Sequence, residues 1–319
     1  MSEPLEARNF FPALQRNVTP TPSGSTVVSY TSDLGDGKPI LTLIHGYPQS
    51  AFIWRHITPT LLGKVSLFIP ELPGYGISTP SPPSKRSVGA ALLAALSTLF
   101  SGPRHVILSG HDRGARICHR LAVDAASAPP NLKIIGAFLL DIVPTKVQWD
   151  RFSDPAIARG YFHWPLLANV ELAVGMLKAY GGGRWARGAF RLAGKNEEGL
   201  RRLEDGVEVY VGLFDKEEVI RGSCEDYEAG AGVDVEEQVA DQREGRKIGV
   251  PTVVMFSEAG LGARMDVARE WADWVQEGVP YEAVPVGEGY GHYLPEEAHD
   301  IVSEKMISFL KEIEGVELN

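Results

Sequence analysis

The residues with the clearest chemical potential lie around Asp112, in the run Val106-Ile-Leu-Ser-Gly-His-Asp-Arg-Gly-Ala-Arg116. The apolar residues predict a buried strand, and Gly110-His-Asp-Arg-Gly114 predicts a sharp turn into a helix with Asp112 at its apex. This frame matches G-x-S-x-G, in which a serine nucleophile stands clear of the sheet. A carboxylate in that place can instead displace a leaving group at an sp3 carbon and form an ester on the protein. Asp112 is therefore the candidate nucleophile of a displacement reaction.

Cleavage of such an ester requires a general base to activate water and an acid to orient that base. His292 lies in the glycine-rich loop Gly287-Glu-Gly-Tyr-Gly-His-Tyr-Leu-Pro295, and Asp141 ends the apolar run Phe138-Leu-Leu-Asp141. Ligands of open α/β sheets bind at the carboxyl ends of the strands. We therefore expect Asp112, Asp141 and His292 to converge from three strand ends.

Two of these assignments have plain alternatives. Asp141 can be a turn or helix cap, as short polar residues at strand ends often are, and Glu258 or Asp266 would then be the acid. His292 can be a loop histidine with no chemical role, which is the weaker interpretation in this glycine-rich setting.

The segment Ile44-His-Gly-Tyr-Pro48 follows a predicted strand, where backbone N–H groups commonly form an oxyanion hole. We expect the N–H groups of Tyr47 and Arg113 to stabilise the oxyanion that forms when water attacks the ester. His45 is interpreted as a structural residue of this loop. The Tyr47–Pro48 bond is a candidate for a cis peptide, a geometry essentially confined to bonds that precede proline.

Arg113 and Arg116 lie three residues apart on the first turn of the predicted helix, so both are expected on one face that points into the site. Two guanidinium groups there suit a carboxylate or a similar anion. The alternative is that each forms a salt bridge with an acidic side chain elsewhere in the chain.

Recurrent apolar runs predict the strands that must position these residues. Such runs suit strands buried on both faces of a parallel sheet, and helix-like patterns alternate with them, which favours a doubly wound α/β fold. Strands are predicted at 27–30, 40–44, 65–69, 106–108, 134–140, 251–256 and 281–284, and helices at about 51–62, 87–101, 114–128, 265–277 and 297–314.

The alternation breaks between about Pro144 and Lys247, where the pattern becomes helical. We interpret residues 144–247 as a helical cap inserted into a core formed by residues 1–143 and 248–319. Within the cap, the glycine-rich stretch Leu172–Phe190 contains no pattern that can be assigned, and it is a candidate for enlarging the pocket.

Charge and composition narrow the classes of partner. The net charge of −10 argues against general nucleic-acid binding, which needs a basic surface. No apolar stretch is long enough for a membrane span, and Met1–Arg8 lacks the pattern of a secretory signal, so a cytoplasmic protein is expected. Cys118 and Cys224 have no metal-ligand spacing, and neither a metal nor an organic cofactor is expected.

Taken together, the motifs resemble those of the fluoroacetate (haloacetate) dehalogenases, a group of α/β-hydrolases related to the epoxide hydrolases. Each motif is weak alone, but their order along the chain is specific. They are His45-Gly-Tyr-Pro-Gln49, Pro73-Gly-Tyr-Gly-Ile-Ser78, Gly110-His-Asp-Arg-Gly-Ala-Arg116, Leu140-Asp-Ile-Val-Pro-Thr145, Tyr161-Phe-His-Trp164, Cys224-Glu-Asp-Tyr-Glu-Ala-Gly230 and Gly291-His-Tyr-Leu-Pro-Glu-Glu297. The resemblance implies an α/β-hydrolase fold with a mostly parallel eight-stranded sheet.

The resemblance also implies roles for individual residues. Asp112 would be the nucleophile, His292 the base and Asp141 its partner, while Arg113 and Arg116 would hold the carboxylate of a small 2-haloacid. Three residues, His163, Trp164 and Tyr227, would receive the departing halide, since each offers a hydrogen-bond donor. The alternative for the aromatic residues is a role in packing the cap.

Two other functions stay open at this point. An epoxide hydrolase would use the same Asp112 and His292, with His163 and Tyr227 donating to the oxygen of the opening ring; Arg113 counts against it, because related epoxide hydrolases usually have an apolar or aromatic residue there. A ligand-binding receptor is the other, because the fold alone does not fix function. The expected partner is a small anionic molecule, and a homodimer is possible.

Overall fold

The computed structural model describes residues 4–313, 316 and 318, and Met1–Glu3 and residue 314 of the predicted segments lie outside this range. An eight-stranded sheet forms its centre, with the order β1-β2-β4-β3-β5-β6-β7-β8. β2 runs antiparallel to β1 and β4, and the other neighbouring pairs are parallel. The predicted fold class is therefore confirmed. The strands are β1 (Gln15–Pro20), β2 (Thr26–Ser32), β3 (Ile40–Thr42), β4 (Ser66–Pro70), β5 (Arg104–His111), β6 (Leu132–Leu140), β7 (Thr252–Ser257) and β8 (Tyr281–Val286).

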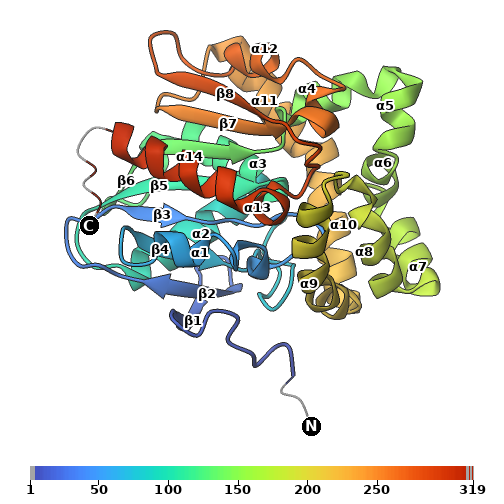
Figure 1. Ribbon diagram of the computed structural model, residues 1–319, viewed down its shortest axis with the longest axis horizontal. Coiled ribbons are helices and arrows are strands. Elements are labelled where there is room, and N and C mark those ends of the chain that lie inside the picture. Colours follow the sequence, from blue (N-terminus) through green and yellow to red (C-terminus); the bar gives the residue numbers. More distant parts are fainter. Residues whose placement is uncertain (1–3, 314–315, 317, 319) are drawn as a thin grey trace.

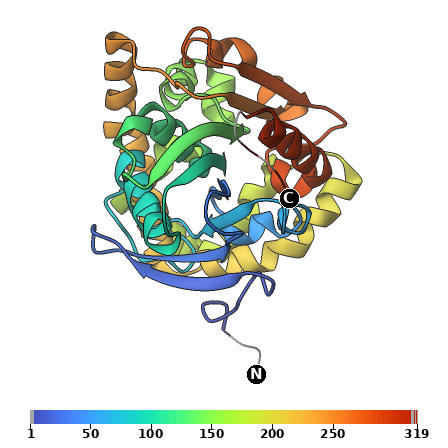
Figure 2. The same ribbon diagram turned by 90° about the vertical axis from the view of Figure 1, so that its left-hand side faces the viewer.

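Helices cover both faces of this sheet (Figure 2). Alternate residues of the central strands explain the two layers, because Val106 and Leu108 pack into one apolar cluster and Ile107 into the other. The first cluster includes α2 and α3, and the second includes α1 and α14. The helices outside residues 144–247 are η1 (Ala51–Trp54), α1 (Thr58–Leu61), α2 (Lys85–Leu99), α3 (Arg113–Val123), η2 (Ala125–Ser127), α12 (Val267–Ala272), α13 (Leu294–Glu297) and α14 (His299–Glu312), and a π-helical turn η5 covers Glu258–Gly262.

Residues 144–247 form a run of helices between β6 and β7, and α5 to α10 gather at one end of the sheet (Figure 1). The division of the chain into a core and a cap at these residue numbers stays a prediction. The helices of this segment are α4 (Thr145–Asp150), η3 (Arg151–Ser153), α5 (Pro155–Gly160), α6 (His163–Leu167), α7 (Val170–Tyr180), α8 (Gly182–Ala189), η4 (Phe190–Leu192), α9 (Glu197–Phe214), α10 (Glu217–Ala231) and α11 (Val233–Glu244).

Several elements differ from the patterns in the sequence. The predicted helix at 51–62 is two short helices, η1 and α1. The patterns do not predict β1, because its sequence Gln-Arg-Asn-Val-Thr-Pro is polar and lies at the exposed edge of the sheet. The predicted helix at 265–277 is limited to α12, whose first residue Val267 follows the capping Asp266. Among the described helices, none is both long and apolar enough to cross a membrane.

Candidate active site

The turn between β5 and α3 holds Asp112 in an unusual backbone conformation, with φ of 48° and ψ of −116°. The two flanking glycines explain how the chain adopts this turn. A Cβ atom on Gly110 would lie 2.5 Å from the carbonyl carbon of Gly114, and one on Gly114 would lie 2.2 Å from the backbone oxygen of Ile44. Only glycine at both places lets α3 start this close to β5 and to the backbone of Ile44, which follows β3.

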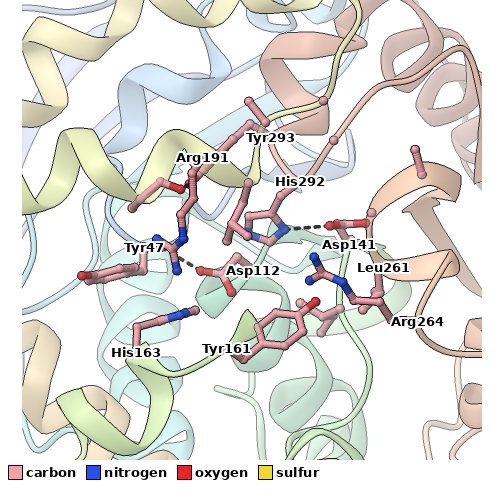
Figure 3. Close-up of a pocket in the computed structure, with 18 of the residues that line it drawn as sticks. Tyr47, Asp112, Asp141, Tyr161, His163, Arg191, Leu261, Arg264, His292 and Tyr293 are labelled. Carbon is pink, nitrogen blue, oxygen red and sulfur yellow. Dashed lines mark hydrogen bonds and ion pairs between the residues drawn. The ribbon is translucent and has the colours of Figure 1, made fainter. Parts of the chain in front are cut away.

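The structure brings His292 and Asp141 together. His292 Nδ1 lies 2.7 Å from Asp141 Oδ2. Figure 3 marks this contact with a dashed line. The other carboxylate oxygen, Asp141 Oδ1, accepts hydrogen bonds from the backbone N–H of Ser257 at 2.7 Å and from its hydroxyl at 2.8 Å. These bonds fix the carboxylate that orients the His292 ring. The sequence patterns do not identify Ser257, because a serine at the end of a strand carries no specific signal.

The two alternative acids are placed elsewhere. Glu258 is exposed to solvent. Asp266 accepts a hydrogen bond from the backbone N–H of Arg269 at 3.1 Å and so caps α12. Of the three carboxylates considered from the sequence, Asp141 is the one that contacts His292.

The surroundings of His292 favour its role as a base. Burial lowers the pKa of His292, but the hydrogen bond with Asp141 and the negative charges of Asp141 and Asp112 outweigh burial, so the pKa lies above its ordinary value. For Asp112, burial raises the carboxyl pKa, but the positive charges of His292, Arg113 and Arg116 lower it by a larger amount. The pKa of Asp112 therefore lies below its ordinary value. Asp112 is thus held as a carboxylate, the form a nucleophile requires.

His111 holds the loop that carries His292. Its Nε2 lies 2.7 Å from the backbone oxygen of His292. Burial lowers the pKa of His111 to about 4, so the ring is neutral near pH 7 and donates this hydrogen bond from Nε2. The residue before the nucleophile therefore fixes the position of the base.

The Tyr47 N–H already contacts the nucleophile. It donates a hydrogen bond to Asp112 Oδ2 at 2.9 Å, and Asp112 Oδ1 has no such partner among the described residues. The Arg113 N–H is the first of α3 and has no acceptor within that helix. Asp112 Oδ1 is therefore the oxygen that the described residues leave without a donor, and Oδ2 is the oxygen that the Tyr47 N–H holds. The role of the Arg113 N–H as a second donor stays a prediction. The Tyr47–Pro48 peptide is cis, as the sequence suggested.

The arrangement of Arg113 differs from the sequence expectation. Its guanidinium is fully buried and bound by Asp226, with Nε 2.5 Å from Asp226 Oδ2 and Nη2 2.8 Å from the Asp226 backbone oxygen. It also packs on the ring of Tyr227, 4.1 Å from the ring centre. Arg113 thus forms an ion pair with the buried Asp226. Arg113 is not among the residues that line the cavity. The prediction that Arg113 and Arg116 together bind one substrate anion is therefore wrong for Arg113, which binds Asp226 instead.

Arg116 does line the cavity. Its Nη1 donates to the backbone oxygen of Val143 at 2.9 Å and to the Thr145 hydroxyl at 3.1 Å. Its Nε is buried and has no partner, and no hydrogen bond is formed by Nη2 among the described residues. Burial and the nearby charge of Arg113 lower the pKa of Arg116 to about 10, which still leaves it charged at pH 7. The free Nε–Nη2 edge is the geometry that binds a carboxylate through two parallel hydrogen bonds.

His163, Trp164 and Tyr227 are buried and line the same cavity as Asp112. The ring centres of His163 and Tyr227 lie 5.8 Å apart, and those of Trp164 and Tyr227 lie 5.7 Å apart. Neither the Trp164 indole N–H nor the Tyr227 hydroxyl has a hydrogen-bond partner in the described part of the chain. Burial, assisted by the charge of Arg191, lowers the pKa of His163 to about 3, so this ring is a neutral donor.

The cavity has a volume of about 310 Å³ and is lined by residues from both sides of the site (Figure 3). Three of its cationic residues, Arg191, Lys195 and Arg264, are not predicted from the sequence. The glycine-rich stretch 172–190 leads into Arg191, but no pattern points Arg191 at the site. Of the described residues, no three of His, Cys, Asp and Glu are grouped so that they could hold a metal ion.

Comparisons with known proteins show the family of this chain. Residues 43–304 match the alpha/beta hydrolase family. The chain is 29% identical to the fluoroacetate dehalogenase of a Burkholderia species over 289 residues, which cover 85% of this chain and 88% of the relative. It is 27% identical to the soluble epoxide hydrolase of Corynebacterium sp. strain C12, with 86% and 91% covered.

A solved structure also has the same fold as this chain. The "putative epoxide hydrolase" of Pseudomonas aeruginosa superposes with a TM-score of 0.81 and 28% identity, covering 96% of this chain and 98% of that one. The sheet, the strand-to-helix turn with Asp112 and the family match together define a hydrolase. The chain belongs to the alpha/beta hydrolase family.

Proposed function

We propose that this protein is a hydrolytic dehalogenase of small 2-haloacids that uses Asp112 as a covalent nucleophile. The observation that carries the proposal is the pairing, in one cavity, of the free Asp112 Oδ1 with the unoccupied Nε–Nη2 edge of Arg116. A substrate carboxylate on Arg116 would bring its C2 atom toward Asp112. The curated relative named fluoroacetate dehalogenase supports this choice of reaction.

In the first step, Asp112 Oδ1 attacks C2 with inversion, and the electrons of the carbon–halogen bond leave with the halide. The unpartnered donors of His163, Trp164 and Tyr227 receive that halide. The product of the step is an ester between Asp112 and the substrate, and the carbonyl oxygen of that ester is Oδ2, which the Tyr47 N–H stabilises.

In the second step, His292 takes a proton from water, and the resulting hydroxide adds to Asp112 Cγ. The tetrahedral intermediate then expels the substrate oxygen, to which His292 returns its proton, and a 2-hydroxyacid is released. The carboxylic acid left on Asp112 loses its proton to solvent. Asp141 keeps the His292 ring in position during both transfers.

Epoxide hydrolysis is the second candidate, because His163 and Tyr227 lie together in the cavity that holds Asp112, and several relatives are named epoxide hydrolases. Opening an epoxide requires transfer of a proton to the ring oxygen. Burial raises the pKa of Tyr227 well above its ordinary value, and His163 is neutral, so both are poor acids although both can donate hydrogen bonds. This favours a leaving group that needs only hydrogen bonds, such as a halide.

Product release from a substrate panel tests the proposal. The purified protein is offered fluoroacetate, chloroacetate, 2-chloropropionate and a neutral aryl epoxide, and both halide and diol are quantified. We expect halide from the acids and no diol. Diol formation without halide would overturn the dehalogenase proposal in favour of epoxide hydrolysis, and binding without turnover of any compound would favour a receptor.

A further inference from the structure

The outer part of the cavity carries more positive charge than a substrate with one carboxylate requires. Arg116 is 3% exposed and lies at the bottom of the cavity beside Asp112. Arg191, Lys195 and Arg264 also line the cavity but are exposed, which places them toward its mouth. The acidic residues that line it are Asp112 and Asp141, and Asp141 is paired with His292. This excess contrasts with the net charge of −10 of the whole chain.

Neither mouth arginine is engaged by an acidic side chain of the described residues. Arg191 donates to the backbone oxygen of Gly188 at 3.2 Å and lies over the ring of Phe162. Arg264 lies over the ring of Tyr161, with its guanidinium carbon 5.0 Å from the ring centre. Figure 3 shows the two guanidinium groups on opposite sides of Asp112 and His292, both directed toward the space between them.

Arg191 is carried by a segment that is fixed to the loop of the catalytic base. The backbone N–H of His292 donates to the Leu192 oxygen at 3.0 Å, and that of Lys195 donates to the Gly289 oxygen at 2.7 Å. The carboxylate of Glu297 accepts hydrogen bonds from the N–H groups of Gly194 and Gly291, one from each segment.

Arg264 is carried by a segment that is fixed to the catalytic acid. The Ser257 hydroxyl donates to Asp141 at 2.8 Å and accepts from the Leu261 N–H at 3.0 Å. The Arg264 N–H donates in turn to the Leu261 oxygen at 3.0 Å. Both arginines therefore extend from backbone that is held in register with the reacting groups, which reduces the ordering cost of binding.

We infer that Arg191 and Arg264 form a second anion subsite, so that the preferred substrates are short dicarboxylates with a leaving group at C2. This inference rests on the proposed function for the leaving group, but the subsite itself does not depend on the reaction. The first carboxylate binds Arg116 at the bottom of the cavity, and the second extends toward the mouth. The volume supports a substrate longer than haloacetate, because about 310 Å³ lies within the range of small-molecule sites, roughly 300–1,000 Å³.

The kinetic test compares a dianion with a matched monoanion. The ratio of kcat/KM for 2-chlorosuccinate to that for its 4-methyl ester is measured in the wild type and in the variants Arg191→Gln, Arg264→Gln and the double variant. We expect the dianion to be preferred, and each single substitution to reduce the ratio by about fivefold and the double by at least tenfold. The ratio cancels losses of activity common to both substrates.

Arg184→Gln is the matched control. Arg184 is an exposed arginine of α8 that lies outside the cavity and has no acidic partner among the described residues, so its replacement should leave the ratio unchanged. High salt should reduce the wild-type ratio, since charges at the mouth are screened. A wild-type ratio near one, or a ratio that falls equally in Arg184→Gln, would overturn the subsite.

A binding experiment separates the subsite from the proposed reaction. Calorimetry measures the affinity of the wild-type protein for succinate, glutarate and adipate, each against its monomethyl ester. Tighter binding of at least one diacid, lost in the double variant, supports the subsite even where no 2-haloacid is turned over, in which case the dehalogenase proposal alone fails. Equal binding of every diacid and its ester would overturn the subsite even where 2-haloacids are turned over.

Discussion

The side chains on the two sides of the cavity differ in their hydrogen bonding. On the side of the sheet, Asp112, Asp141 and His292 each form a hydrogen bond that fixes the orientation of the side chain or of its loop. On the side of residues 144–247, the Tyr227 hydroxyl and the Trp164 N–H have no partner among the described residues. The fixed side suits groups that must react in one geometry, and the unpartnered side suits groups that receive a ligand.

The same contrast separates Arg113 from Arg116, although both begin the same helix. The Nε–Nη2 edge of Arg113 is occupied by Asp226, whereas that edge of Arg116 is free. Asp226 also accepts hydrogen bonds from Lys85 at 2.5 Å and Tyr75 at 3.0 Å. Arg113 thus joins a buried network that links α3 to α10, and Arg116 lines the cavity.

The largest expected effect follows removal of the nucleophile. Asp112→Asn preserves the shape of the side chain but removes the attacking charge, and it should reduce kcat by at least about four orders of magnitude. Halide release from 2-chloropropionate measures the loss. Asp266→Asn is the control, since Asp266 only caps α12, and it should leave kcat within about twofold. Appreciable dehalogenation by Asp112→Asn would contradict the assignment of the nucleophile.

The second effect concerns stability and tests the role of Arg113. Arg113→Gln leaves the buried Asp226 with one cationic partner, Lys85, in place of two, which should destabilise the fold by about 2–3 kcal/mol. Urea unfolding measures the change. The double variant Arg113→Gln/Asp226→Asn should recover part of the loss, because the buried charge that lost one of its two cationic partners is then removed. An Arg113→Gln protein that is as stable as the wild type but has a much higher KM would instead show that Arg113 binds the substrate.

The third effect is smaller and concerns binding by Arg116. Arg116→Gln should lower kcat/KM for 2-haloacids by about 10- to 100-fold, the scale of one or two charge-assisted hydrogen bonds. Unfolding in urea should change less than in Arg113→Gln, because no acidic side chain loses its partner. Equal losses on a charged and a neutral substrate would show that Arg116 does not bind the carboxylate.

These two arginines also show what the sequence can and cannot predict. The turn around Asp112 and the ends of β6 and β8 could be placed from local patterns, because parallel strands bring their carboxyl ends to one edge. The position of Arg113 could not, because it depends on Asp226, which is 113 residues away in sequence. Helical spacing predicts which face of the helix a side chain lies on, but it does not predict which distant residue that side chain binds.

The arginines at the mouth of the cavity could not be predicted from the sequence for the same reason. Arg191 lies in the three-residue helix η4 and Arg264 lies just after η5, and their positions depend on contacts made by Glu297 and Ser257. A lone arginine in a loop is usually solvated, so its sequence context gives no signal. The edge strand β1 was also hidden, since its polar residues lack the apolar pattern of the central strands.

The smallest effect is a change in the titration of His292. The negative charge of Asp112 contributes to the raised pKa of His292, so Asp112→Asn should lower that pKa. Only the neutral ring can accept a proton, and wild-type turnover should therefore fall as the pH drops through the His292 pKa, above its ordinary value near 6.5. NMR titration of the imidazole measures both proteins. An unchanged or higher pKa in Asp112→Asn would show that the two groups are not coupled.

Oxygen labelling in a single turnover tests the covalent mechanism most directly. Excess enzyme reacts once with 2-chloropropionate in H2(18)O, and mass spectrometry then examines both the product and the peptide that contains Asp112. We predict that the label enters the Asp112 carboxylate and that the first hydroxyacid carries an unlabelled oxygen from Asp112. Label in the product hydroxyl with none in Asp112 would show direct attack by water and would contradict the assignment of Asp112 as the nucleophile.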